Sequence, residues 1–150
     1  MSDNLLRFIP TDPEFVPQQA SAERALGHLV AVVPAAEEVT QATSENVQFV
    51  DPGANFERVS CPQCGQELSI EWWQDRMDEA FTDNFATLSI TTPCCGTTVS
   101  LNDLKYEWPA GFARFVLEAR NPGVADLTSE DVATLSDIVG SPLRRIWAHY

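Results

Sequence analysis

Positively charged side chains are scarce in this chain of 150 residues. Lysine and arginine together number nine, against 22 aspartate and glutamate residues, and the formal net charge at pH 7 is -13. A surface of this sign repels phosphate backbones, and nucleic-acid affinity depends mainly on lysine and arginine contacts. Direct nucleic-acid binding is therefore not expected, and anionic lipid surfaces are disfavoured for the same reason. A protein partner, especially a basic one, is compatible with this charge, and electrostatic steering would speed their encounter.

Long apolar runs are also missing. The sequence has no stretch of about 18 apolar residues, so it predicts no transmembrane helix. The segment 1–10 carries Asp3 and Asn4 and lacks the basic-then-apolar pattern of a secretory signal peptide. We therefore expect a soluble, cytoplasmic protein with no membrane partner. Because 44% of its residues are hydrophobic, the chain can form a core of its own, and a metal would organise only part of the fold.

The motifs of common catalytic sites are absent as well. There is no Gly-x-Ser-x-Gly, no Walker loop and no His-Glu-x-x-His. His149 could serve as a general base, but a histidine on a terminal strand is more often a surface or packing residue. The zinc-deaminase signature needs His-x-Glu before its cysteine pair, whereas Ser69-Ile70-Glu71 follows the first pair here and contains no histidine. An enzyme is therefore the less favoured class.

What the sequence does contain is four cysteines in two close pairs: Cys61 with Cys64, and Cys94 with Cys95. In a reducing cytoplasm, pairs this close indicate metal ligands before disulfides. The spacing in Cys61-Pro62-Gln63-Cys64-Gly65 lets both thiolates point at one ion, while backbone amides donate hydrogen bonds to the sulfurs. Gly65 suits the positive φ that such a turn needs. A redox pair would normally open a helix, whereas a strand is expected after Gly65.

The second pair is less regular than the first. Pro93-Cys94-Cys95-Gly96 aligns with Pro62-Gln63-Cys64-Gly65, so Thr92 falls where the first cysteine of the turn would fall. Two interpretations remain open. Either Cys94 and Cys95 both bind the ion, or Cys95 binds alone and the fourth ligand is histidine, aspartate, glutamate or water. Because both histidines are distant in sequence, four cysteines and one structural Zn²⁺ are favoured. A mononuclear iron site would use the same ligands, but zinc is the commoner occupant.

These two glycine-ended turns resemble those of zinc-ribbon proteins, over roughly residues 59–100. The longer run, from Phe49-Val50-Asp51 to Trp108-Pro109-Ala110-Gly111-Phe112, is similar to uncharacterised small bacterial proteins. The second resemblance implies no activity. Zinc ribbons occur in transcription factors, ribosomal proteins, enzymes and adaptors, so the first implies a fold without choosing a function.

Periodicity predicts an α+β fold, a single domain over 1–150 with about four helices packed on a mixed sheet. A zinc-ribbon-like pair of β-hairpins is expected as an inserted module at 59–101. The expected strands are 5–9, 39–50, 86–91, 97–101 and 143–150, and the expected helices are 18–33, 71–83, 110–120 and 128–139. Residues 102–106 are expected to form an exposed loop. Trp73 should face the core, with Trp72 outward against Arg76 or packed on the hairpins.

Three functions follow as hypotheses. The favoured one is a non-enzymatic protein-interaction module with a structural zinc, acting as an adaptor or as an acidic inhibitor of the immunity type. An example of its partner would be a basic nuclease toxin. The second is an accessory factor of nucleic-acid machinery, which the ribbon suggests and the charge opposes. The third is a thiol or zinc-dependent enzyme that uses Cys94 or an open zinc position.

Overall fold

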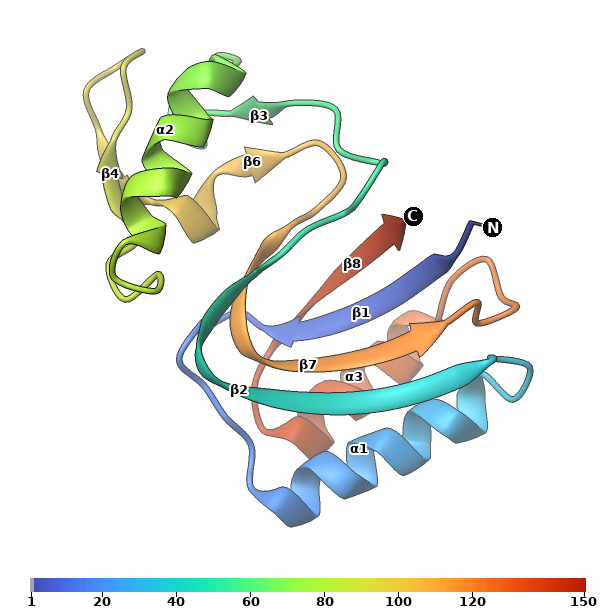
Figure 1. Ribbon diagram of the computed structural model, residues 1–150. Coiled ribbons are helices and arrows are strands. Elements are labelled where there is room, and N and C mark those ends of the chain that lie inside the picture. The colour runs from blue at the N-terminus through green and yellow to red at the C-terminus, as the bar shows by residue number, and fades with distance from the viewer. Residues whose placement is uncertain (1) are drawn as a thin grey trace.

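The computed structural model describes residues 2–150, and its main lobe is a four-stranded sheet with helices on one face (Figure 1). The sheet order is β2-β7-β1-β8, and all three neighbouring pairs are antiparallel. One isolated parallel bridge joins Gly53 to His149. The expected α+β class, with helices packed on a sheet, is confirmed. The bounds of its elements are β1 Asn4–Pro10, β2 Glu38–Val50, β7 Gly111–Arg120, β8 Leu143–His149, α1 Gln19–Val32 and α3 Ser129–Val139.

The first core lies between this sheet and α1 with α3. Leu6 and Phe8 alternate along β1 and are fully buried against the helices, as a two-residue period requires. The helix α3 begins at Thr128, whose hydroxyl accepts the Asp131 backbone N–H at 3.1 Å, and ends at Gly140 with φ 90°. Within the described residues, none of the helices combines the length and the apolar character that crossing a bilayer requires.

The helix predicted near 110–120 is wrong, because this segment is the central strand β7. Phe112, Phe115, Val116 and Ala119 match helical spacing, but the buried side chains follow a two-residue period over much of the strand. Phe115 packs in the first core, whereas Val116 lies on the opposite face with Ile9 and Ile146. Val116, an apolar side chain on the face without helices, stands at helical spacing from Phe112 and Ala119, and this hides the two-residue period of the strand. Residues 2–150 therefore contain three α-helices where about four were expected.

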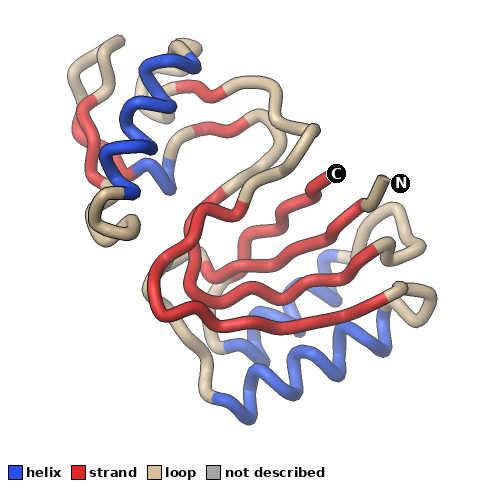
Figure 2. The backbone as a smooth tube through the Cα atoms, viewed as in Figure 1, coloured by secondary structure: helices blue, strands red, loops and turns tan. Residues whose placement is uncertain are grey.

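A second lobe stands beyond one end of the sheet, and β2 and β7 curve towards it (Figures 1 and 2). Trp73 packs in its core, with ring centroids 5.3 Å from Phe56 and 5.8 Å from Phe49. Phe49 and Phe112 belong to β2 and β7, so this core extends beyond the predicted module at 59–101. Its elements are β3 Val59–Ser60, α2 Ile70–Phe81, β4 Ser89–Thr91, β5 Thr98–Ser100, the 3-10 helix η1 Leu101–Asp103 and β6 Lys105–Tyr106.

Residues 102–106 are not the exposed loop that was expected, because Asn102 and Tyr106 are buried. The Asn102 Oδ1 atom accepts the Phe112 backbone N–H at 2.9 Å and the Arg144 Nη1 donor at 3.1 Å. Its Nδ2 donates to the Thr11 carbonyl at 3.1 Å. The burial of a polar side chain cannot be predicted from the sequence when its hydrogen-bond partners lie far away along the chain. Asn102 thus connects the second lobe to β7, to β8 and to the residue that follows β1.

Replacing Asn102 with alanine is expected to destabilise the protein by about 3 kcal/mol, because the Phe112 N–H and the Thr11 carbonyl lose their buried partner. Urea unfolding of the purified protein would measure this loss. The neighbouring exposed side chain provides the control, and Asp103→Ala should change stability by less than about 0.5 kcal/mol. Equal effects from both substitutions would contradict the structural role of Asn102.

Candidate metal centre

The first cysteine turn follows β3 directly. The Cys61 backbone N–H donates to the Gln66 carbonyl at 2.9 Å, and the Gly65 N–H donates to the Cys61 carbonyl at 2.9 Å. Gly65 has φ 78°, a conformation that favours glycine. These bonds close a tight turn, as the cysteine spacing predicts. The strand expected after Gly65 is reduced to a single bridge between Glu67 and Ser60, because α2 begins at Ile70.

The second turn joins β4 to β5 and repeats the same backbone bonds. The Thr92 N–H donates to the Thr97 carbonyl at 2.9 Å, and the Gly96 N–H donates to the Thr92 carbonyl at 3.0 Å. Thr92 therefore occupies the backbone position that Cys61 has in the first turn, as the sequence alignment indicates. Its hydroxyl lies 3.6 Å from the Cys95 sulfur. This contact was not predicted from the sequence. The alignment of Thr92 with Cys61 could have indicated it, because it places Thr92 beside the cysteine cluster.

The fold brings the sulfurs of all four cysteines together. The Cys61 and Cys95 sulfurs are 3.8 Å apart, and the Cys64 and Cys94 sulfurs are 3.4 Å apart. All four lie within 4.8 Å of one another, and each cysteine is free. A tetrahedral ion with metal–sulfur bonds of about 2.3 Å would separate its sulfurs by about 3.8 Å. The group can therefore hold a metal ion, and these separations are too long for disulfides, whose S–S bond is about 2.05 Å.

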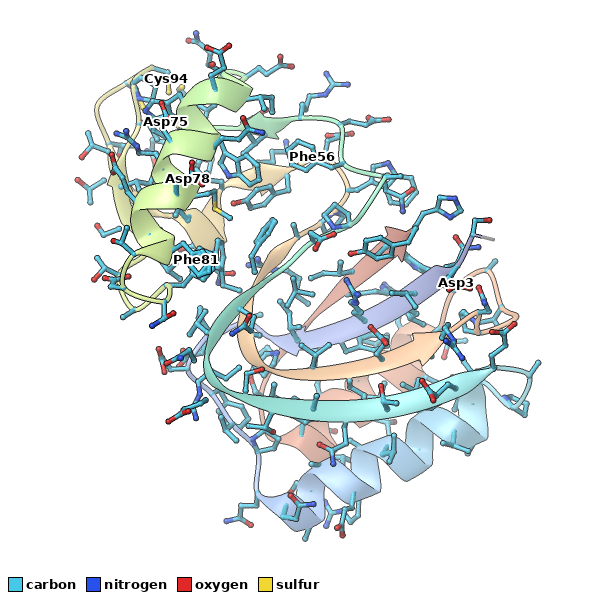
Figure 3. All side chains as sticks on the ribbon, viewed as in Figure 1. Asp3, Phe56, Asp75, Asp78, Phe81 and Cys94 are labelled. Carbon is cyan, nitrogen blue, oxygen red and sulfur yellow. The ribbon has the colours of Figure 1, made fainter. Side chains whose placement is uncertain are left out.

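The histidines lie elsewhere. His28 is on α1, with its Nε2 atom 3.8 Å from Asp131 on α3, and His149 is on β8, hydrogen-bonded to Asn4. Cys94 has the spacer position of its turn, yet its sulfur belongs to the cluster. Figure 3 shows Cys94 at the outer end of the second lobe, beside α2. Of the two interpretations of the second pair, this geometry favours the one in which both cysteines reach the ion.

Electrostatics within the cluster shift the pKa values of Cys61 and Cys64 in opposite directions. The backbone N–H of Cys64 lowers the pKa of Cys61 to about 6, against the opposing effect of burial and with help from the Gln63 N–H. The Gln66 N–H favours a Cys64 thiolate, but hydrogen bonding with Cys94, burial and the other cysteines raise its pKa to about 11. A bound cation removes this conflict, because it stabilises several adjacent thiolates together.

The two tryptophans of α2 support the cluster from the helix side. Trp73 is buried, as expected, and its Nε1 donates to the Tyr106 hydroxyl at 3.3 Å. The Tyr106 hydroxyl donates in turn to the Leu101 carbonyl at 2.7 Å. Trp72 lies under the Arg76 guanidinium at 5.9 Å, so the expected contact with Arg76 is confirmed, and it also packs against the core of the second lobe. The aromatic side chains therefore join α2 to the segment that follows β5.

Comparisons with known proteins assign this chain to no family. No family model matches it, and no match was found among curated proteins or solved structures. The resemblance to zinc-ribbon proteins therefore stays a prediction, and the functional argument depends on the geometry of the site.

Proposed function

We propose that the protein is a non-enzymatic zinc-binding module that acts through interaction with another protein. The observation that carries this proposal is the cluster of four cysteine sulfurs within 4.8 Å. Four thiolates complete the tetrahedral coordination of Zn²⁺ and leave no open position for substrate or water, which is the arrangement of structural sites. Soft thiolate ligands favour zinc over magnesium, calcium or manganese.

In this proposal the metal stabilises the second lobe. The strands β3 and β6 have two residues each, and β4 and β5 have three each. Strands this short contribute little stability alone, since even an isolated two-stranded hairpin is marginal in water. A metal that joins the turn after β3 to the turn after β4 would supply the missing energy, because binding energy becomes folding energy when the ligands meet only in the folded state.

The surface offered to a partner would be the outward face of α2. We call this surface the acidic face, and it consists of exposed Glu71, Asp75, Asp78 and Glu79 on α2, with Asp83 just after the helix. One of these acids, Glu79, pairs with Arg76 at 2.9 Å. Figure 3 shows Asp75, Asp78 and Phe81 along this helix. Phe81 is 60% exposed and stacks on Phe85, which gives the acidic face an aromatic contact at its end. The chemistry fits a basic protein, since complementary charge raises association rates and an exposed aromatic can anchor an interface.

Neutralising two acids of the acidic face is expected to weaken partner binding about tenfold without unfolding the protein. The variant is Asp75→Asn with Asp78→Asn, and its matched control neutralises two exposed acids of the main lobe, Glu23→Gln with Glu45→Gln. Tagged, metal-loaded protein is purified from its native cells, and co-purifying proteins are quantified by mass spectrometry. A basic protein should fall about tenfold with the α2 variant and stay with the control.

Two results would contradict the proposed interface. One is equal recovery of the same partner with both variants, and the other is a recovered partner whose net charge is negative. The salt dependence of recovery gives a further check, because an electrostatic interface between exposed charges weakens as ionic strength rises.

A further inference from the structure

A second feature, apart from the cysteines, is an open cavity of about 950 Å³ beside the chain termini. It lies where the start of β1 and the end of β8 meet three loops, and its central lining residues are Asn4, Asn55, Trp108, Asn121, Trp147 and His149. Figure 3 shows Asp3, the neighbour of Asn4, well separated from Cys94 in the second lobe. A cavity of this size suits a small ligand.

Trp108 is the most unusual residue of the cavity. Its φ is 62°, in the left-handed region that a bulky side chain rarely adopts, and its side chain is 43% exposed. The residue before it is fixed, since the Glu107 backbone N–H donates to the Arg58 carbonyl at 2.8 Å. Strained residues persist where the surroundings impose them and cluster at ligand sites. The strain here holds an exposed indole at the cavity.

Trp147 contributes a second indole from β8. It packs partly against the first core and also lines the cavity. Its backbone carbonyl accepts the Asn55 Nδ2 donor at 3.1 Å, which positions the Asn55 amide at the same place. Indoles offer a flat apolar face together with one N–H donor. The cavity thus combines aromatic surfaces with amide side chains.

The neutral polar groups around these indoles are already oriented by one another. The Asn4 Oδ1 atom lies 2.8 Å from the His149 Nδ1 atom, and the Asn121 Oδ1 accepts the Asn4 backbone N–H at 2.9 Å. The first of these bonds uses one polar atom of each side chain. Within residues 2–150 the second atoms, Asn4 Nδ2 and His149 Nε2, have no hydrogen-bond partner, so together they can offer a ligand donors and an acceptor.

Charge restricts the class of ligand. The cavity lining includes no lysine or arginine, and its one acidic residue, Asp126, is held by Arg145 at 2.7 Å. The chain as a whole carries a net charge of -13. Phosphates and other anions would therefore be repelled. We propose that this cavity binds an uncharged ring compound, a saccharide or a nucleoside, whose flat face packs on Trp108 and whose polar edge bonds Asn4 and His149.

Saturation-transfer NMR on the full-length, metal-loaded protein tests this site with two panels of probes. One panel holds neutral mono- and disaccharides, and the other holds nucleosides with their 5′-monophosphates. A compound from one of the two panels is expected to bind, and this result shows whether the ligand is a saccharide or a nucleoside. If nucleosides bind, each should bind about tenfold more tightly than its monophosphate. Trp108→Gly should weaken binding about tenfold or more, whereas Trp108→Phe should retain most of it.

The variants separate binding from folding. Glycine accepts the φ of Trp108 without strain, so Trp108→Gly should not lower the melting temperature. Val30→Ala removes an exposed apolar side chain of α1, outside the cavity, and should leave binding unchanged. The proposal is overturned if neither panel binds, if Trp108→Gly binds as tightly as the native chain, or if monophosphates bind as tightly as nucleosides.

Discussion

Replacing Cys61 with serine is expected to release the metal and unfold the second lobe. Cys61 is fully buried in the second core, and its sulfur lies 3.8 Å from that of Cys95. A serine hydroxyl does not ionise near neutral pH and is a poor ligand for a thiolate-selected ion. Metal content should fall about tenfold, and the lobe should lose more than about 3 kcal/mol, because its folding depends on the bound ion. Elemental analysis and hydrogen exchange of the amides of 59–106 would measure both effects.

The main lobe should survive this change, because α1, α3 and the four-stranded sheet have a core of their own. Its amides are expected to stay protected while those of the second lobe exchange. Gln63→Ser provides a control in the same turn, at an exposed spacer position, and should keep its metal. Full metal retention in Cys61→Ser, or simultaneous unfolding of both lobes, would contradict this division.

The second large effect is the restoration of metal binding by a second substitution in the turn that holds Cys94 and Cys95. Cys94→Ser alone should lose the metal, because it removes the sulfur that lies 3.4 Å from Cys64. Adding Thr92→Cys should restore it, because Thr92 occupies the backbone position that Cys61 has in the first turn. Its hydroxyl is 3.6 Å from the Cys95 sulfur, so a thiol there can reach the same ion. Elemental analysis of the single and double variants should show about one ion per chain only in the double variant.

The matched control for this rescue is Thr92→Ser combined with Cys94→Ser, which keeps a hydroxyl at the first position and should stay metal-free. Metal bound by Cys94→Ser alone would show that Cys94 is dispensable and that another ligand completes the site. A double variant that folds without metal would show that the two turns are not equivalent in spite of their matching backbone bonds.

Local signals explain what the sequence could predict. The short apolar run in β1, the helical spacing in α1 and the Thr128 cap of α3 each depend on residues close in the chain, and each element was found where expected. The cysteine turns were also predicted from residues close in the chain, because each ends in a glycine, Gly65 or Gly96, and both glycines have positive φ. The clustering of the two turns was inferred from a single assumption, that both pairs serve one ion.

Features that depend on distant contacts were missed. The strand β7 was predicted as a helix because its strand character depends on pairing with β1 and β2, which the sequence places more than 20 residues away. Asn102 and Trp108 give no periodic signal, since one is buried through partners at Thr11 and Arg144 and the other is marked only by its backbone angle. The burial of a polar side chain and the strain of a backbone angle arise from tertiary contacts, so they can be recognised only in the folded structure.

X-ray absorption spectroscopy of the protein as purified tests the metal centre most directly. The clustered sulfurs predict about one zinc per chain with four sulfur neighbours at about 2.3 Å, and no nitrogen or oxygen neighbour. Chelation should then lower the stability of the second lobe. A spectrum with a mixed shell of sulfur and oxygen or nitrogen, or a protein whose stability is unchanged after its metal is removed, would contradict a structural four-cysteine zinc site.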